Sequence, residues 1–124
     1  MYRIEYYRND NGISEFEEYY NKLREKTERN KDARIRYNTI SRYISFLQRY
    51  GTAYLPSDYA KQIYEDIWEL RPDKYRIFYF FFKNDTYVLL NDFEKKTRKT
   101  PDSEIKRAIK ERNDYVNRNK KRVF

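Results

Sequence analysis

Four cationic side chains lie within five consecutive positions, at Lys95, Lys96, Arg98 and Lys99. The run follows a segment with the pattern of a strand and precedes one with the pattern of a helix, so we expect an exposed connection. Connections of this kind often carry binding sites. A run of like charge is also commonly no more than a solvated surface, so its charge alone predicts only a polyanionic partner.

Arg76 is the one charged residue in the apolar and aromatic segment Tyr75–Phe82. A buried guanidinium group costs free energy unless it meets an anion. That anion could be a carboxylate such as Glu69 or Asp92, or a phosphate gripped by two N–H groups of the planar fork. The side chain could instead extend to solvent, and these alternatives stay open from the sequence.

Glu69 and Arg71 alternate with Trp68 and Leu70, so the two charged side chains share one face of a short strand. An ion pair between them on the surface would contribute little to stability. If Arg71 and Arg76 converge with the cationic run, they form one anion-binding patch together. Glu69 would then be a candidate base.

The composition narrows the chemistry that such a patch could perform. The chain of 124 residues contains no His and no Cys. Disulfides, thiolate ligands and imidazole acids or bases are therefore excluded, a zinc site is not expected, and we expect no cofactor. Any proton transfer must use Lys, Glu, Asp or Tyr. The formal net charge of +8 at pH 7 favours RNA, DNA, an acidic protein or an anionic membrane surface as partner.

The hydropathy pattern indicates where in the cell the protein is expected. No stretch approaches the roughly 18 apolar residues of a membrane span, and the first residues lack the apolar segment of a signal peptide. We therefore expect no contact with the membrane interior. The lack of Cys is compatible with a reducing compartment, and we expect the protein in the cytoplasm.

Strands are predicted where apolar side chains alternate with polar ones or run continuously. Residues 52–64 look irregular, with Pro56 as a breaker. Tyr75–Phe82 is apolar or aromatic at nearly every position, so we expect a central strand that is covered on both faces. The predicted strands are Met1–Tyr7, Ile67–Arg71, Tyr75–Phe82 and Thr86–Asn91.

Two helices joined by a short polar link are predicted between the first two strands. Ser14, followed by Glu17, has the pattern of a capping box and begins the first helix, which we expect to end near Glu28. Asp32 is the predicted N-cap of the second helix. That helix ends at Gly51, which we expect to adopt a left-handed conformation.

A last helix is predicted after the cationic run, with Thr100 as N-cap and Pro101 at the first helical position. Residues 117–124 look like a frayed basic tail. The resulting order, β-α-α-β-β-β-α, predicts an α+β fold in which a small antiparallel or mixed sheet carries an N-terminal helical hairpin and a C-terminal helix. We expect residues 1–124 to form a single domain.

Three segments at this spacing resemble the RelE/ParE toxin superfamily, and in particular its HigB-like, phage-associated branch. They are WELR at 68–71, YRIFY at 75–79 and LLNDFEKKTRKTP at 89–101, and the similarity continues at Glu104, Ile105 and Ala108. The resemblance covers Ile13 to about Tyr115. It implies a RelE-like fold, which agrees with the order of elements expected from periodicity.

The resemblance also implies a function. Members of this branch are toxins of type II toxin–antitoxin systems that cleave mRNA without a metal ion, commonly on the ribosome, and thereby inhibit translation. The implied partners are mRNA, ribosomal RNA and a cognate antitoxin, the last in a toxin–antitoxin hetero-oligomer. Two alternatives stay open: a ParE-like toxin that binds DNA gyrase without cutting RNA, and an inactive phage-associated binding module.

The functional residues implied by the resemblance fall within the three segments. We expect Arg76 to stabilise the negative charge of a phosphorane and Lys95 or Lys96 to transfer a proton, with Glu69 as reserve base. Many relatives carry His where this chain has Asn91, and Asn cannot supply a titrating proton. The expected RNA contacts are Arg71, Asn91, Arg98 and Lys99.

Overall fold

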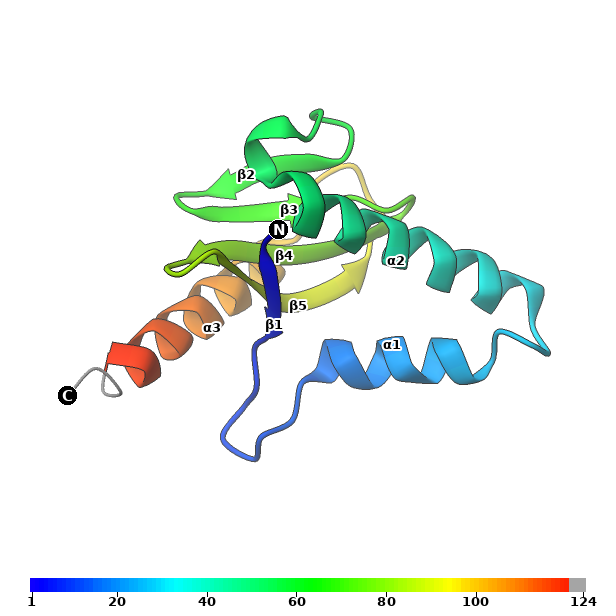
Figure 1. Cartoon of the computed structure of the whole chain (residues 1–124), viewed down its shortest axis with the longest axis horizontal. Helices are drawn as coiled ribbons and strands as arrows, with labels where there is room; N and C mark the ends of the chain where they lie inside the picture. Colours follow the sequence, from blue (N-terminus) through cyan, green and yellow to red (C-terminus); the bar gives the residue numbers. More distant parts are fainter. Residues whose placement is uncertain (121–124) are drawn as a thin grey trace.

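The computed structural model describes residues 1–120, which form a five-stranded sheet with helices on both faces (Figure 1). The predicted α+β class, with a mixed sheet, an N-terminal helical hairpin and a C-terminal helix, is confirmed. The strands are β1 Arg3–Tyr6, β2 Ala60–Tyr64, β3 Ile67–Leu70, β4 Tyr75–Phe82 and β5 Thr86–Glu94. The helices are α1 Glu15–Glu25, α2 Lys31–Tyr50 and α3 Asp102–Lys120, with a 3₁₀ turn η1 at Thr52–Tyr54.

The strands lie in the order β1-β5-β4-β3-β2, with β1 parallel to β5 and each other neighbouring pair antiparallel. Short turns join β2 to β3, β3 to β4 and β4 to β5, so these four strands form a meander. Because β3 and β5 run opposite to β4, both end at the same edge of the sheet where β4 begins. The three segments that resemble toxin sequences therefore meet at this edge.

Strand β2 corrects the expectation that residues 52–64 are irregular. It pairs antiparallel with β3, and a bulge interrupts the pairing between Gln62 and Tyr64. Lys61 and Gln62 are exposed on this edge strand. The periodicity of the sequence does not predict this strand, because hydrogen bonds to β3 hold it in place rather than an alternating apolar face.

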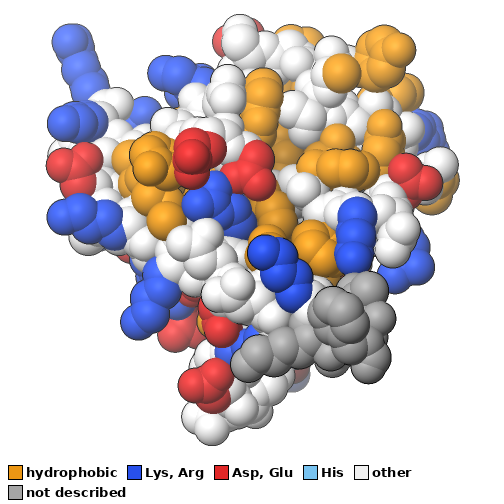
Figure 2. Space-filling model, turned by 90° about the vertical axis from the view of Figure 1, so that its left-hand side faces the viewer, with side chains coloured by type: hydrophobic (Ala, Val, Ile, Leu, Met, Phe, Trp, Pro, Cys, Tyr) orange, Lys and Arg blue, Asp and Glu red, His pale blue; other side chains and the backbone are white. Residues whose placement is uncertain are grey.

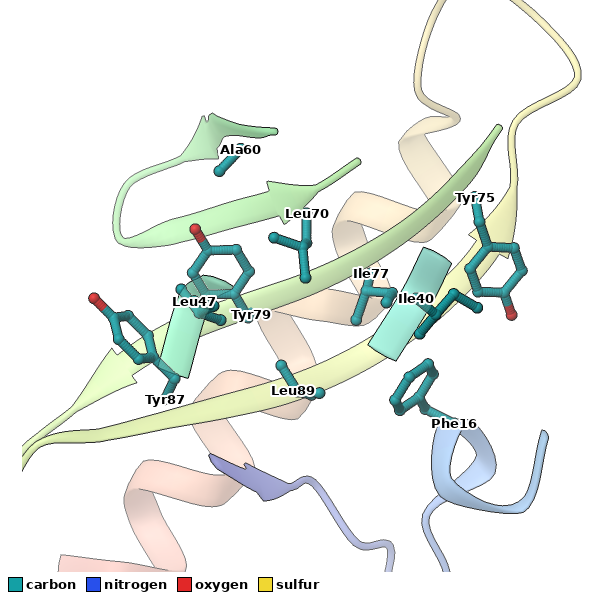
Figure 3. Close-up of a cluster of buried hydrophobic side chains, with 10 residues drawn as sticks. All are labelled: Phe16, Ile40, Leu47, Ala60, Leu70, Tyr75, Ile77, Tyr79, Tyr87 and Leu89. Carbon is teal, nitrogen blue, oxygen red and sulfur yellow. The ribbon is translucent and has the colours of Figure 1, made fainter. Parts of the chain in front are cut away.

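The sheet buries apolar side chains on both faces, as predicted for its central strand β4. Ile77 and Tyr79 lie in the cluster that α1 and α2 cover, which Figure 3 shows between the sheet and the two helices. Phe78 and Phe80 lie in the second cluster, which includes Ala108 of α3. This alternation follows from the two-residue period of a strand, and it fixes which side chains of β4 face α3.

Side chains cap both helices of the hairpin. The Ser14 hydroxyl accepts a hydrogen bond from the Glu17 amide at 3.1 Å, which confirms the predicted N-cap of α1. The N-cap of α2 is Asn30 and not Asp32, and its side chain accepts a backbone N–H three residues on, at 3.0 Å. Helix α1 ends before the predicted position because residues 26–30 are all polar and gain no apolar packing from a helical conformation.

Gly51 ends α2 as predicted and has a positive φ of 77°, but its ψ of 164° lies outside the left-handed helical conformation that was expected. Its amide donates to the Leu47 carbonyl at 3.0 Å. A Cβ atom at this position would lie 2.8 Å from the Tyr2 ring, and the Tyr2 amide donates to the Gln48 carbonyl at 2.8 Å. A glycine is therefore required twice here, by the backbone conformation and by the close approach of the N-terminal strand.

The start of α3 differs from the prediction. Thr100 is not its N-cap, because the Thr100 hydroxyl donates to the Glu69 carboxylate at 3.1 Å. The amides of Glu104 and Ile105 reach the Pro101 carbonyl instead, at 3.0 and 3.3 Å. The sequence pattern assigned the Thr100 side chain to the start of α3, but this side chain contacts the sheet instead.

The end of α3 also corrects an expectation. Residues 117–120 continue the helix rather than forming part of a frayed tail. Arg118 holds this last turn in place through ion pairs with Asp10 at 2.8 Å and Asp114 at 2.6 Å. Residues 121–124 of the expected tail lie outside the described residues.

Candidate functional site

The edge of the sheet where β3 and β5 end and β4 begins carries a shallow cationic groove. The Lys95 amide donates to the Lys74 carbonyl at 2.7 Å and holds the run after β5 against the turn before β4. Figure 1 shows this connection from β5 to α3 beside the start of β4. The residues that line the groove are Asp73, Lys74, Arg76, Glu94, Lys95, Lys96, Thr97 and Arg98. Cations outnumber anions in this set, so the groove attracts anions.

Arg76 is the buried cation of this set, with 8% of its surface exposed. Its Nη1 atom donates to the main-chain carbonyls of Asp73 at 2.7 Å and Tyr75 at 2.8 Å. Its Nε atom is buried and has no hydrogen-bond partner within residues 1–120. Burial lowers the pKa of Arg76, and the nearby Glu69 carboxylate opposes this shift. Because arginine keeps its charge under such perturbation, the groove contains a fixed cation.

Glu69 is almost completely buried, with 1% of its surface exposed. Its Oε2 atom lies 3.6 Å from Nε of Arg71 and 3.8 Å from Nε of Arg76. Its Oε1 atom accepts the hydrogen bond from Thr100. Glu69 is therefore the carboxylate partner of Arg76 that the sequence left undecided. Its burial argues against the expected role as reserve base, because a base must reach the proton that it removes.

Asp92, the other carboxylate considered for Arg76, lies on the opposite face of the sheet. It accepts a hydrogen bond from the Tyr75 hydroxyl. Burial raises the pKa of both groups. The guanidinium carbon of Arg36 lies 5.6 Å from the centre of the Tyr75 ring, and Arg36 also pairs with Glu94 at 3.0 Å. These contacts brace the start of β4 against the helical hairpin.

The side chains of the cationic run differ in exposure. Lys95 is half-buried, whereas Lys96, Arg98 and Lys99 are exposed. Within the described chain, Lys99 is not a lining residue of the groove. Its carbonyl accepts a hydrogen bond from the Thr97 hydroxyl at 2.9 Å. Three cations of the run therefore share the groove with Arg76, and the fourth does not.

Among the described residues, Asn91 and Arg71 do not line the groove, although Arg71 shares the Glu69 carboxylate with Arg76. A bulge in β5 lets both Leu90 and Asn91 face α3. The Asn91 amide group donates to the carbonyl and to the carboxylate of Glu104, each at 3.2 Å, and 4% of the residue is exposed. Arg71 is half-buried beside the Glu69 carboxylate. Their placement does not favour the RNA contacts expected of them.

The predicted site residues did not include Lys74 and Thr100, nor Asp73, Glu94 and Thr97 of the groove lining. Lys74 lies in the turn before Arg76. It could have been recognised from the sequence, because a tight turn lies at the same edge of the sheet as the first residues of the strand that follows it. Thr100 could not have been recognised. Its partner Glu69 is 31 positions away in the chain, and the following Pro101 gives Thr100 the local pattern of an N-cap.

The opposite end of the sheet has a different surface. Figure 2 shows that end, where hydrophobic side chains gather in the upper part of the view with Lys and Arg side chains around them. The exposed side chains of Tyr64, at the end of β2, and Phe81, near the end of β4, belong to this end of the molecule. An aromatic surface of this kind does not by itself favour a polyanion, so we place the candidate site at the cationic groove.

Comparison with known protein families shows the family of this chain. The profile of a family described as phage-derived protein Gp49-like (DUF891) matches residues 29–113, which is most of the chain. The chain belongs to the Gp49-like family. This family consists of RelE/ParE-like toxins, so the superfamily that the three sequence segments indicated is confirmed.

The Gp49-like match includes all of α2, every residue of the cationic groove and more than half of α3. Membership of a family of toxins implies an antitoxin as partner. No curated protein matches the chain significantly. Within residues 1–120, none of the helices combines the length and the apolar character that a membrane crossing requires.

Proposed function

We propose that this Gp49-like protein is a HigB-like toxin that cleaves mRNA without a metal ion, acts on the translating ribosome and so inhibits translation in the cytoplasm. The observation that carries the proposal is the position of Arg76. It is a buried cation, fixed by two main-chain carbonyls, in a groove that Lys74, Lys95 and Arg98 also line. Preorganised cations are what a reaction needs when negative charge accumulates on phosphate.

The proposed reaction is an internal transfer at one phosphate. The 2′-oxygen of a ribose forms a bond to the adjacent phosphorus, the bond from phosphorus to the 5′-oxygen breaks, and a cyclic phosphate and a free 5′-hydroxyl result. One proton leaves the attacking oxygen and another reaches the leaving oxygen. Arg76 stabilises the added charge of the phosphorane, because its guanidinium group is held in place before the substrate arrives.

Lys95 is the first candidate for proton transfer, and Lys96 is the second. The backbone of Lys95 is fixed by its hydrogen bond to Lys74, and its side chain is half-buried beside Arg76 in the groove. Lys96 lines the same groove but is exposed. A proton-transfer group must be held at a set position, which favours the more constrained lysine.

The test is an in vitro translation reaction in which the 5′ ends of the mRNA fragments are mapped. We expect discrete cuts within codons with the wild-type protein, and none with a folded Arg76→Ala variant. The matched control is Arg3→Ala, because Arg3 is an exposed arginine of β1 outside the groove. Thermal unfolding of each variant shows whether it is folded.

The same preparation separates the alternatives. Intact mRNA together with inhibited DNA supercoiling would show that the protein is a ParE-like gyrase toxin and not a nuclease. Intact mRNA with normal supercoiling would show that the protein is an inactive binding module. Wild-type cleavage by folded Arg76→Ala would remove Arg76 from the mechanism.

A further inference from the structure

We infer that Glu69 is a positioning residue that keeps the cationic groove in shape, and not a base. Its carboxylate joins three separate parts of the chain: its own strand β3, Arg76 of β4 and Thr100 at the end of the cationic run. The inference rests on the proposed function for the meaning of the groove. Its physical content, that Glu69 holds the run in place, can be measured whether or not RNA is cleaved.

The two oxygens of Glu69 have different tasks. Oε2 faces the Nε atoms of both Arg71 and Arg76, at 3.6 and 3.8 Å. These distances are too long for hydrogen bonds, so the contact with Arg76 is electrostatic and its main-chain acceptors hold the guanidinium group. Oε1 accepts the hydrogen bond from Thr100 at 3.1 Å. One buried carboxylate therefore compensates two cations and holds one hydroxyl.

The charge of Glu69 keeps the two arginines together. Arg71 lowers the pKa of Arg76 by repulsion, whereas Glu69 raises it by attraction, and burial exceeds both effects. If the carboxylate were neutral, the buried Arg76 and the half-buried Arg71 would lie near each other without their shared anion. Breaking a buried pair by removing one partner is strongly unfavourable, so the arginines would move apart.

The hydrogen bond from Thr100 anchors the cationic run. Among the described residues, the run is tied at its start to the turn before β4 by the Lys95 amide, which donates to the Lys74 carbonyl. It is tied at its end by the Thr100 hydroxyl, which donates to Glu69. Another side-chain bond, from Thr97 to Lys99, lies within the run itself. Loss of the Thr100 anchor would free one end of the run and widen its range of positions relative to Arg76.

A base and a positioning residue differ in their pH profiles. If Glu69 removed the 2′ proton, Glu69→Gln would abolish the chemical step and the acidic limb of the rate profile. For a positioning residue, Glu69→Gln lowers the rate but leaves the shape of the profile unchanged. Thr100→Val should reproduce part of the loss, and Thr100→Ser should restore it because it keeps the hydroxyl.

The decisive experiment measures amide hydrogen exchange across residues 95–100, together with cleavage of translated mRNA between pH 5 and 9. We expect Thr100→Val to speed exchange in this segment about tenfold, the effect of losing one hydrogen bond to a charged group. Glu69→Gln keeps an oxygen that can accept from Thr100 but loses the charge, so it should speed exchange by a smaller factor. Thr100→Ser should exchange like the wild type. The matched control is Thr39→Val, which removes a hydroxyl of α2 that donates to the Ile35 carbonyl outside the groove.

Each outcome decides a different point. Unchanged exchange in both Thr100→Val and Glu69→Gln overturns the positioning role, and so does loss of the acidic limb in Glu69→Gln. Faster exchange that Thr100→Ser restores supports it, even if the wild type cleaves no mRNA. That last result would refute the proposed nuclease while leaving Glu69 as the residue that shapes the groove. Thr100→Val keeps the test valid if Glu69→Gln fails to fold.

Discussion

Arg76 is the residue whose surroundings decide the chemistry of the groove. Two carbonyls accept hydrogen bonds from its Nη1 atom, and the Glu69 carboxylate lies on the side of its Nε atom. A guanidinium group fits this arrangement because its donors lie in a plane at fixed angles. A lysine ammonium is a point charge and cannot satisfy the two carbonyls while also presenting a donor plane to phosphate.

We therefore expect Arg76→Lys to keep the fold and lose about 10² or more in kcat/KM for mRNA cleavage, the range for removing one preorganised donor. The measurement is the rate of cleavage of one translated mRNA at saturating ribosome concentration. Arg3→Lys, at an exposed position of β1, provides the comparison. A fully active Arg76→Lys protein would show that charge alone, and not the fork, is needed.

Arg98 and Lys99 are adjacent cations with different placements. Arg98 lines the groove, and within the described chain Lys99 does not. Removing one cation that neutralises a phosphate should flatten the slope of log Kobs against log salt by about 0.7 on single-stranded RNA. We expect Arg98→Ala to flatten the slope by this amount and Lys99→Ala to leave it unchanged.

Fluorescence anisotropy with a short single-stranded RNA at several salt concentrations gives the slope. Equal flattening by both substitutions would show that the RNA extends beyond the groove. It would restore the expectation, drawn from the sequence, that Lys99 contacts RNA.

At the scale of elements, the contact between the N-terminal strand and the end of α2 depends on one glycine. Gly51 and Gly12 share a φ of 77°, but only Gly51 has the Tyr2 ring where a Cβ atom would lie. Around Gly12 nothing lies within 4 Å of such an atom. Of the two positions, Gly51 is therefore the more demanding, because it combines the contact with Tyr2 and a ψ of 164° that essentially only glycine adopts.

We expect Gly12→Ala to lower the free energy of unfolding by about 1–2 kcal/mol, the cost of a left-handed conformation for a residue with a Cβ atom. Gly51→Ala should lower it further, because Tyr2 must also move and disturb the pairing of β1. Urea unfolding of both variants checks the difference. Equal losses would mean that Tyr2 moves aside without cost.

At the scale of the whole molecule, stability should depend on pH through buried carboxylates, since the chain has no histidine. Burial raises the pKa of Asp92 and of Glu111 in the folded state. The folded protein therefore binds protons more tightly than the unfolded chain at these groups. Their contribution to stability is complete below the ordinary carboxylate range, near pH 4, and is lost as pH rises through the raised values.

Asp92→Asn tests this sign. The variant keeps an oxygen that can accept from Tyr75 but cannot ionise, so its stability relative to the wild type should increase as pH rises from 4 to 7. Tyr75→Phe should have the opposite consequence: it removes a hydrogen bond that lowers the pKa of Asp92, and so steepens the loss. Thermal unfolding at both pH values measures these changes, and a difference that stays constant with pH would contradict the prediction.

The sequence by itself determined the features that depend on near neighbours in the chain. The nearly continuous run of apolar and aromatic residues at Tyr75–Phe82 predicted the central strand with the bounds that the structure has. Ser14 and Gly51 marked helix ends because caps and terminators act within a few residues. The cationic run was visible from the order of residues 95–99. Its position between β5 and α3 placed it at the edge of the sheet where the groove lies.

Only the tertiary structure decided which of the candidate side chains share one site. It buried Glu69 between Arg71 and Arg76, joined it to Thr100 and turned Asn91 toward α3. It also made a strand of β2, whose partner gives it hydrogen bonds that its own short sequence cannot predict. These features depend on residues far apart in the chain, and a buried charge is stable only where the fold supplies its partners.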